Sequence, residues 1–171
     1  MNSTAINSKL VIATAAIISA FVVLYWQFMP VVIGSVAEAR GYSESELGFL
    51  ASAYAGGLFL TTLSGVFWIR RYDWRVLIRA GSFIATLAFL VPLYYESYEM
   101  LLLCHLLASL GGGIGYGVTL SLLGDTKEPA RNYAISFFAQ VALGIVATLA
   151  LSNIESPTLA LKSGFILMAV V

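Results

Sequence analysis

Five polar side chains inside long apolar runs are the residues of this chain that could do chemistry: Gln27, His105, Ser109, Tyr116 and Gln140. The histidine titrates near neutral pH and could carry a coupling proton. The amides and hydroxyls could form hydrogen bonds to an uncharged solute. Because long polar groups are costly to bury in hydrocarbon, such residues predict either an interior hydrogen bond or a solute-binding position.

The spacing of these groups predicts that they share helix faces. One stripe steps by four and three residues through His105, Ser109, Gly112, Tyr116 and Thr119. A second stripe steps by four through Asn132, Ser136, Gln140, Gly144 and Thr148. Both spacings describe one face of an α-helix, and we expect these faces to turn away from lipid. Interhelical hydrogen bonding explains the serines, threonines and asparagine, whereas for Gln27, His105 and Gln140 a wetted cavity is an equal alternative.

The composition requires a lipid environment. Of 171 residues, 60% are hydrophobic and 11% are charged, and the mean hydropathy is +0.90. A soluble domain would carry about 25% charged residues. A net charge of zero argues against a nucleic-acid partner. The single cysteine, Cys104, excludes an intramolecular disulfide. With one histidine and no cluster of Cys and His, no metal site or cofactor is expected.

The apolar runs predict an all-α membrane protein that forms one antiparallel bundle over residues 1–171. A bilayer core needs roughly 20 apolar residues per helix. The predicted spans cover about 10–34, 47–69, 76–95, 98–123 and 131–152, with an incomplete sixth from about 158 to 171. Because the sixth run is still apolar at Val171, we expect the chain to be a fragment of a longer protein.

Local signals mark helix starts and close packing. Ser43 and Glu46 predict a capping box before the second span, and Ser156 predicts the N-cap of the sixth. Five glycines in the fourth span predict close approach of a neighbouring helix; the alternative is a thin wall beside a solute path. These glycines are Gly111, Gly112, Gly113, Gly115 and Gly117.

Charge predicts the orientation, because clustered Lys and Arg stay on the cytoplasmic side. With the N-terminus in the cytoplasm, seven of the nine cations lie inside and only Arg40 and Lys162 lie outside. The inner cations are Lys9, Arg70, Arg71, Arg75, Arg79, Lys127 and Arg131. We therefore expect a multi-pass protein of the plasma (inner) membrane.

The loop after the second span carries a family resemblance. Segment 65–75 is similar to the loop signature of the major facilitator superfamily, Gly-x-x-x-Asp-Arg-x-Gly-Arg-Arg/Lys. Gly65 and Arg70 match, while Ile69 stands where the family has its acid. The residues assigned to this motif are Gly65, Arg70, Arg71, Asp73 and Arg75. In the family that acid helps to latch the cytoplasmic side, a role that Asp73 could partly take over.

The fourth span also resembles this family, in which a Leu-x-x-x-Arg-x-x-Gln-Gly-x-Gly segment is common. Leu101 and Gly111 fit, while His105 stands in place of the arginine, Ala108 in place of the glutamine and Ser109 in place of the first glycine. The resemblance implies the N-terminal six-helix half of a twelve-helix major facilitator fold, with a missing C-terminal six-helix half in the same chain or a partner. It also implies that the first and fourth helices line a central cavity, which suits Gln27 and His105. The three-plus-three helix repeat of such a half is not visible as sequence identity.

The sequence is compatible with two functions. The first is a secondary transporter that moves a small organic solute by alternating access, with a proton as a candidate coupling ion. The second is a non-transporting membrane scaffold or assembly subunit. An intramembrane enzyme is not expected, because no paired carboxylates lie in a span and no serine has an arranged base.

Overall fold

The structure is a computed structural model that describes residues 7–170, and within them every regular element is helical. The helices are α2 (Lys9–Arg40), α3 (Glu44–Trp68), α4 (Trp74–Leu90), the 3-10 turn η1 (Val91–Leu93), α5 (Tyr98–Gly124), α6 (Pro129–Ser152) and α7 (Pro157–Val170). Five of these segments are long and apolar enough to cross a membrane, and α7 is a shorter apolar helix. The prediction of an all-α, multi-pass membrane protein is confirmed.

The capping residues mark where the helices begin and end more closely than the limits of the apolar runs do. Helix α2 continues six residues beyond the predicted limit at 34 and ends where Gly41 takes a left-handed conformation (φ 67°). The predicted capping box is present: the Glu46 N–H donates to Ser43 Oγ at 3.3 Å, and the Ser43 N–H donates to Glu46 Oε2 at 2.8 Å. Ser156 accepts from the Leu159 N–H at 3.4 Å, as predicted for the start of the sixth helix.

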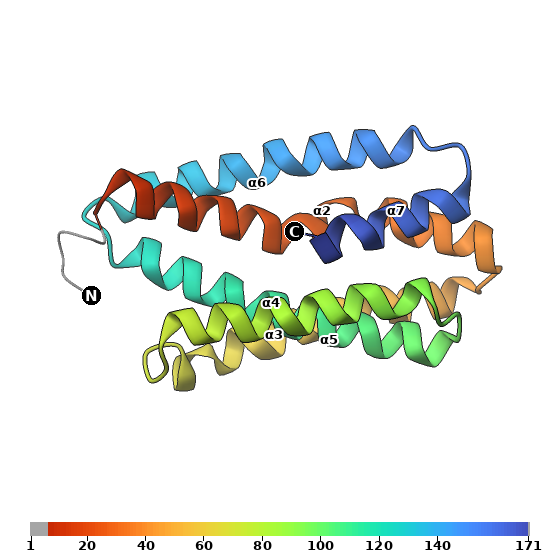
Figure 1. Ribbon diagram of the computed structural model, residues 1–171, viewed down its shortest axis with the longest axis horizontal. Coiled ribbons are helices and arrows are strands. Elements are labelled where there is room, and N and C mark those ends of the chain that lie inside the picture. The colour runs from red at the N-terminus through yellow and green to blue at the C-terminus, as the bar shows by residue number, and fades with distance from the viewer. Residues whose placement is uncertain (1–6, 171) are drawn as a thin grey trace.

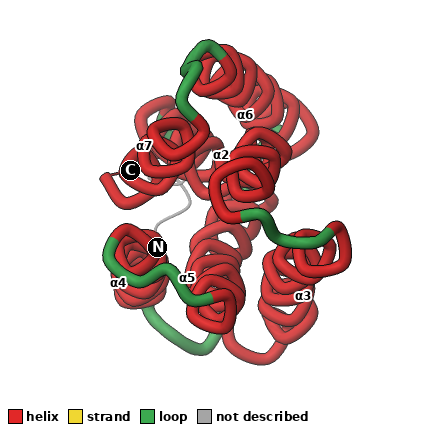
Figure 2. The backbone as a smooth tube through the Cα atoms, turned by 90° about the vertical axis from the view of Figure 1, so that its right-hand side faces the viewer, coloured by secondary structure: helices red, strands yellow, loops and turns green. Residues whose placement is uncertain are grey.

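The helices form two rows of three (Figure 2). One row holds α7, α2 and α6, and the other holds α4, α5 and α3. Within the rows α2 packs on α6 and α7, while α5 packs on α3 and α4. Between the rows α2 packs on α5, and α4 packs on α7. The two middle helices, α2 and α5, are therefore the centre of the bundle.

The pattern of helix–helix contacts is the same for the first three helices as for the last three. The exchange replaces α2 by α5, α3 by α6 and α4 by α7. It turns the α2–α6 contact into the α5–α3 contact, and the α4–α5 contact into the α7–α2 contact, all of which are present. Because α2 and α5 run in opposite directions (Figure 1), the two triplets are related as an inverted repeat.

The five glycines between positions 111 and 117 of α5 bring three neighbouring helices close to its backbone. A Cβ at Gly113 would lie 2.8 Å from Thr61 in α3, and one at Gly111 would lie 2.5 Å from the Gly81 carbonyl oxygen in α4. A Cβ at Gly115 would lie 3.2 Å from Val22 in α2. Gly112 also faces Val22, and Gly117 faces Ile69. Close helix approach, the simpler of the two explanations, therefore accounts for this glycine-rich span.

Charged residues are distributed unevenly between the two ends of the bundle. The start of α2, the α3–α4 connection and the α5–α6 connection lie at one end, on the left in Figure 1. We call it the basic end, because it carries seven of the nine Lys and Arg residues: Lys9, Arg70, Arg71, Arg75, Arg79, Lys127 and Arg131. An ion pair of 2.9 Å between Arg70 and Asp125 joins two connections there.

Substitution of Gly111 by Ala tests the close contact between α4 and α5. We expect Gly111→Ala to lower the unfolding temperature of the detergent-purified protein, measured by circular dichroism, because the Gly81 carbonyl oxygen cannot move aside. Overpacking costs about 1–3 kcal/mol, which outweighs the gain of about 1 kcal/mol for Ala over Gly in a helix. The control is Gly112→Ala, whose Cβ would meet Val22 at an ordinary 3.5 Å. Equal stability of the two variants would contradict the packing described here.

Candidate functional site

His105 lies inside the bundle with both ring nitrogens engaged, and it is only 2% exposed. Its Nδ1 lies 2.8 Å from the Leu101 carbonyl oxygen, and its Nε2 lies 2.7 Å from the Tyr25 hydroxyl of α2. Because a carbonyl oxygen only accepts, Nδ1 carries the hydrogen, and the Tyr25 hydroxyl donates to Nε2. This pairing fits a neutral imidazole whose hydrogen-bonding capacity is used within the protein.

Aromatic rings enclose this hydrogen bond. Tyr25 is fully buried, and the rings around Tyr25 and His105 belong to Phe28, Tyr54, Phe89 and Phe165. These rings come from α2, α3, α4 and α7. The enclosure favours the structural alternative for His105, a hydrogen-bonded histidine that joins α2 to α5.

Gln140 belongs to a second polar cluster, between α2 and α6. Its amide nitrogen lies 3.2 Å from Ser136 Oγ and 3.4 Å from Ser19 Oγ, and the two serine hydroxyls lie 2.5 Å apart. All three side chains are buried. The cluster therefore joins α2 to α6 by interhelical hydrogen bonds. Ser19 is the member that the sequence pattern did not reveal, although it is a polar residue within an apolar run.

Unlike His105, Ser109 and Gln140, Gln27 makes no side-chain hydrogen bond within the described part of the chain. Its aliphatic carbons pass over Gly144 of α6, where an added Cβ would lie 2.8 Å from them. The side chain is half-buried. Beside it Trp26 is 42% exposed and stacks on Tyr54, with ring centroids 6.2 Å apart.

The predicted site residues do not converge on one point. Gln27 and His105 lie at similar depth, because Tyr25 bonds to His105 and is only two residues from Gln27. Two residues correspond to about 200° around a helix, so Gln27 and Tyr25 leave α2 on different sides. Ser109 is buried against Gly57 and donates to the Leu106 carbonyl at 2.9 Å. Tyr116 lies about three turns beyond His105 along α5.

The loop-motif residues have local structural roles in this conformation. Asp73 caps α4 by accepting from the Arg75 N–H at 2.7 Å. The Arg75 guanidinium lies 5.1 Å from the centre of the Trp74 ring. Ile69, which replaces the acid of the family signature, packs near Gly65 and Gly117. The position therefore contributes apolar packing between α3 and α5 in this chain.

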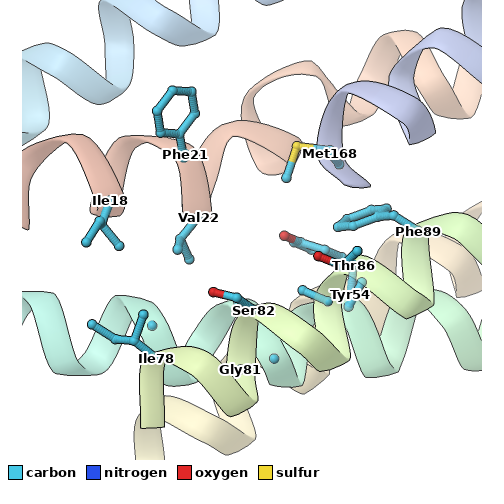
Figure 3. Close-up of a pocket in the computed structure, with 15 residues that line it drawn as sticks. Ile18, Phe21, Val22, Tyr54, Ile78, Gly81, Ser82, Thr86, Phe89 and Met168 are labelled. Carbon is cyan, nitrogen blue, oxygen red and sulfur yellow. The ribbon is translucent and has the colours of Figure 1, made fainter. Parts of the chain in front are cut away.

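A cavity of about 140 Å³ lies on the side of the α2–α5 pair that faces α4 and α7. Figure 3 shows Tyr54, Ser82 and Thr86 among its lining residues, and Met168 at the end of α7. Apart from these hydroxyls its wall is mainly apolar, and the glycine backbones of α4 and α5 form part of it. None of the lining residues was predicted as a site residue, because they come from five helices and share no single sequence spacing.

Within residues 7–170 no three His, Cys, Asp or Glu side chains lie close enough to hold a metal ion. No family model, curated protein or solved structure matches this chain. The resemblance to the major facilitator superfamily therefore rests on the sequence pattern alone.

Removal of the Tyr25 hydroxyl tests the hydrogen bond to His105. We expect Tyr25→Phe to destabilise the protein by about 1–3 kcal/mol, because the buried Nε2 loses its donor. Tyr54→Phe is the matched control, since its ring lies in the same cluster and no described residue accepts from its hydroxyl. Chemical unfolding in detergent provides the comparison.

The nitrogen spectrum of the single histidine gives a second, independent readout. With ¹⁵N-labelled histidine, we expect one protonated nitrogen, Nδ1, and one unprotonated nitrogen, Nε2, whose signal shifts in Tyr25→Phe and is unchanged in Tyr54→Phe. A protonated Nε2 in the wild type, or equal effects of the two substitutions, would show that the hydrogen bond is assigned wrongly.

Proposed function

We propose that this chain is half of a secondary transporter that moves a small uncharged or amphiphilic organic solute by alternating access. The observation that carries the proposal is the inverted exchange of helix contacts between α2–α4 and α5–α7. Inverted repeats recur in transporters, whose substrate sites lie near the middle of the bilayer where the repeats meet. In this bundle that place is the contact between α2 and α5.

The side of the α2–α5 pair that faces α3 and α6 is the better candidate for the solute path. The opposite side is covered by α4 and α7, its aromatic rings enclose the Tyr25–His105 pair, and its cavity of about 140 Å³ has a mainly apolar wall. On the α3–α6 side, the unpaired amide of Gln27 and the exposed ring of Trp26 remain available within the described residues. We therefore assign Gln27 the role of solute ligand, with Tyr116 as a second candidate on α5.

Helical glycines on α2 and α3 support a partner on the outer surface of the bundle. An added Cβ at Gly34, Gly48 or Gly56 would meet nothing within 4 Å among the described residues. A helix-interior glycine costs about 1 kcal/mol relative to alanine. Close packing of another helix against these positions would offset that cost. We propose a second six-helix bundle there, either in the same polypeptide or in a partner chain, so that the solute path lies between the two.

The distribution of charges and the hydrogen bonding of His105 bear on the orientation of the protein and on the kind of solute. The basic end faces the cytoplasm of a plasma (inner) membrane, because seven of the nine cations lie there. The neutral pairing of His105 removes it from direct contact with the solute. Few fixed charges lie within the spans, which favours uncharged or amphiphilic solutes over strongly charged ones.

Transport by Gln27 variants tests this proposal. The protein expressed from its complete gene is reconstituted in proteoliposomes and assayed with a panel of uncharged and amphiphilic solutes, with and without a proton gradient. We expect Gln27→Ala to lower the transport rate at subsaturating solute by about ten-fold, as for the loss of one hydrogen bond worth about 1.4 kcal/mol.

Thr62→Ala is the control, because Thr62 is exposed on α3 and its hydroxyl donates to the Leu58 carbonyl of its own helix. We expect this variant to transport like the wild type. If no solute crosses although the protein is folded, the scaffold alternative is favoured. If Gln27→Ala transports like the wild type, the assignment of Gln27 is wrong.

A further inference from the structure

A cavity of about 550 Å³ lies at the basic end, between the N-terminal ends of α2 and α6. Three cations line it, and they come from three different elements: Lys9 begins α2, Lys127 lies in the α5–α6 connection, and Arg131 lies in the first turn of α6. The single acid among the described lining residues is Glu128, which pairs with Arg131 at 2.7 Å. The lining therefore carries a net charge of +2 (three cations and one acid).

The N-terminus of α6 adds to this positive potential. Glu128, at the N-cap position of α6, makes no side-chain capping hydrogen bond, and Pro129 begins the helix. The positive end of the helix dipole favours an anion at such a terminus. The three cations and the N-terminus of α6 therefore both make the electrostatic potential in this cavity positive.

The cavity is also ordered from polar to apolar along both of its helical walls. In α2, Ile12 and Ala13 follow Lys9 by one turn, and in α6 Ile135 follows Arg131 by one turn. One helical turn corresponds to about 5.4 Å. The cations therefore lie nearer the end of the bundle, and the apolar side chains lie nearer the membrane interior.

We propose that this cavity binds an anionic phospholipid, with the headgroup phosphate between Lys9, Lys127 and Arg131 and an acyl chain along Ile12 and Ile135. A soluble anion would use the cations and leave the apolar wall without an occupant. Basic pockets between transmembrane helices are suited to anionic headgroups. The proposal does not depend on the transporter function.

Native mass spectrometry of the full chain in neutral detergent tests the proposal, with phosphatidylglycerol and phosphatidylcholine of equal chain length as probes. We expect the wild type to bind phosphatidylglycerol in preference. The triple variant Lys9→Gln, Lys127→Gln, Arg131→Gln should bind it at least about ten-fold more weakly, because each cation near a phosphate contributes about 1 kcal/mol. The matched control removes three cations of the same end that do not line the cavity: Arg70→Gln, Arg71→Gln and Arg75→Gln. It should retain the preference.

Several results would overturn the proposal. They are equal binding of the two lipids by the wild type, equal weakening by the two triple variants, and displacement of phosphatidylglycerol by millimolar inorganic phosphate. If the cavity triple variant does not fold, Ile135→Ser takes its place. It should weaken long-chain but not short-chain phosphatidylglycerol, and equal effects on both lipids would reject the acyl-chain contact.

Discussion

Water is absent from the hydrocarbon interior of a bilayer, and the structure of this protein depends on that constraint. Without water, backbone N–H and C=O groups must pair within the protein, which helices achieve along their own length. Lipid provides no hydrophobic force between helices, so association relies on close packing and interhelical hydrogen bonds. The glycines of α5 provide the first, and the Ser19–Ser136–Gln140 cluster provides the second.

The same constraint explains why the two sides of the α2–α5 pair differ. Toward α4 and α7, the polar groups of Tyr25 and His105 satisfy one another and are enclosed by aromatic rings. Toward α3 and α6, Gln27 keeps an amide without a hydrogen-bond partner in the described part of the chain. This half-buried amide lies beside the exposed ring of Trp26, and a solute or a second bundle is the partner that we propose for it.

Much of the fold could be predicted from the sequence, because apolar runs and caps are local signals. The Ser43–Glu46 box and the glycine-rich span were both read correctly. The exchange of α2–α4 with α5–α7 could not be seen, because it is expressed in contacts and not in residue identity.

The site was less accessible to prediction. Helix spacing identified the polar faces that carry His105 and Gln140. The direction in which each side chain leaves its helix depends on neighbours elsewhere in the chain. Tyr25 and Ser19 carried no spacing signal that linked them to His105 and Gln140.

The central claim is that the apolar helices cross a membrane with the basic end in the cytoplasm. It is tested most directly by labelling single cysteines with a membrane-impermeant maleimide in a Cys104→Ala background. Tyr72→Cys and Tyr95→Cys form a matched pair, because the two tyrosines are 65% and 60% exposed and lie at opposite ends of the bundle. The account predicts that Tyr95→Cys is labelled in intact cells and Tyr72→Cys only after permeabilisation. Labelling of Tyr72→Cys in intact cells, or of both positions from the same side, would contradict it.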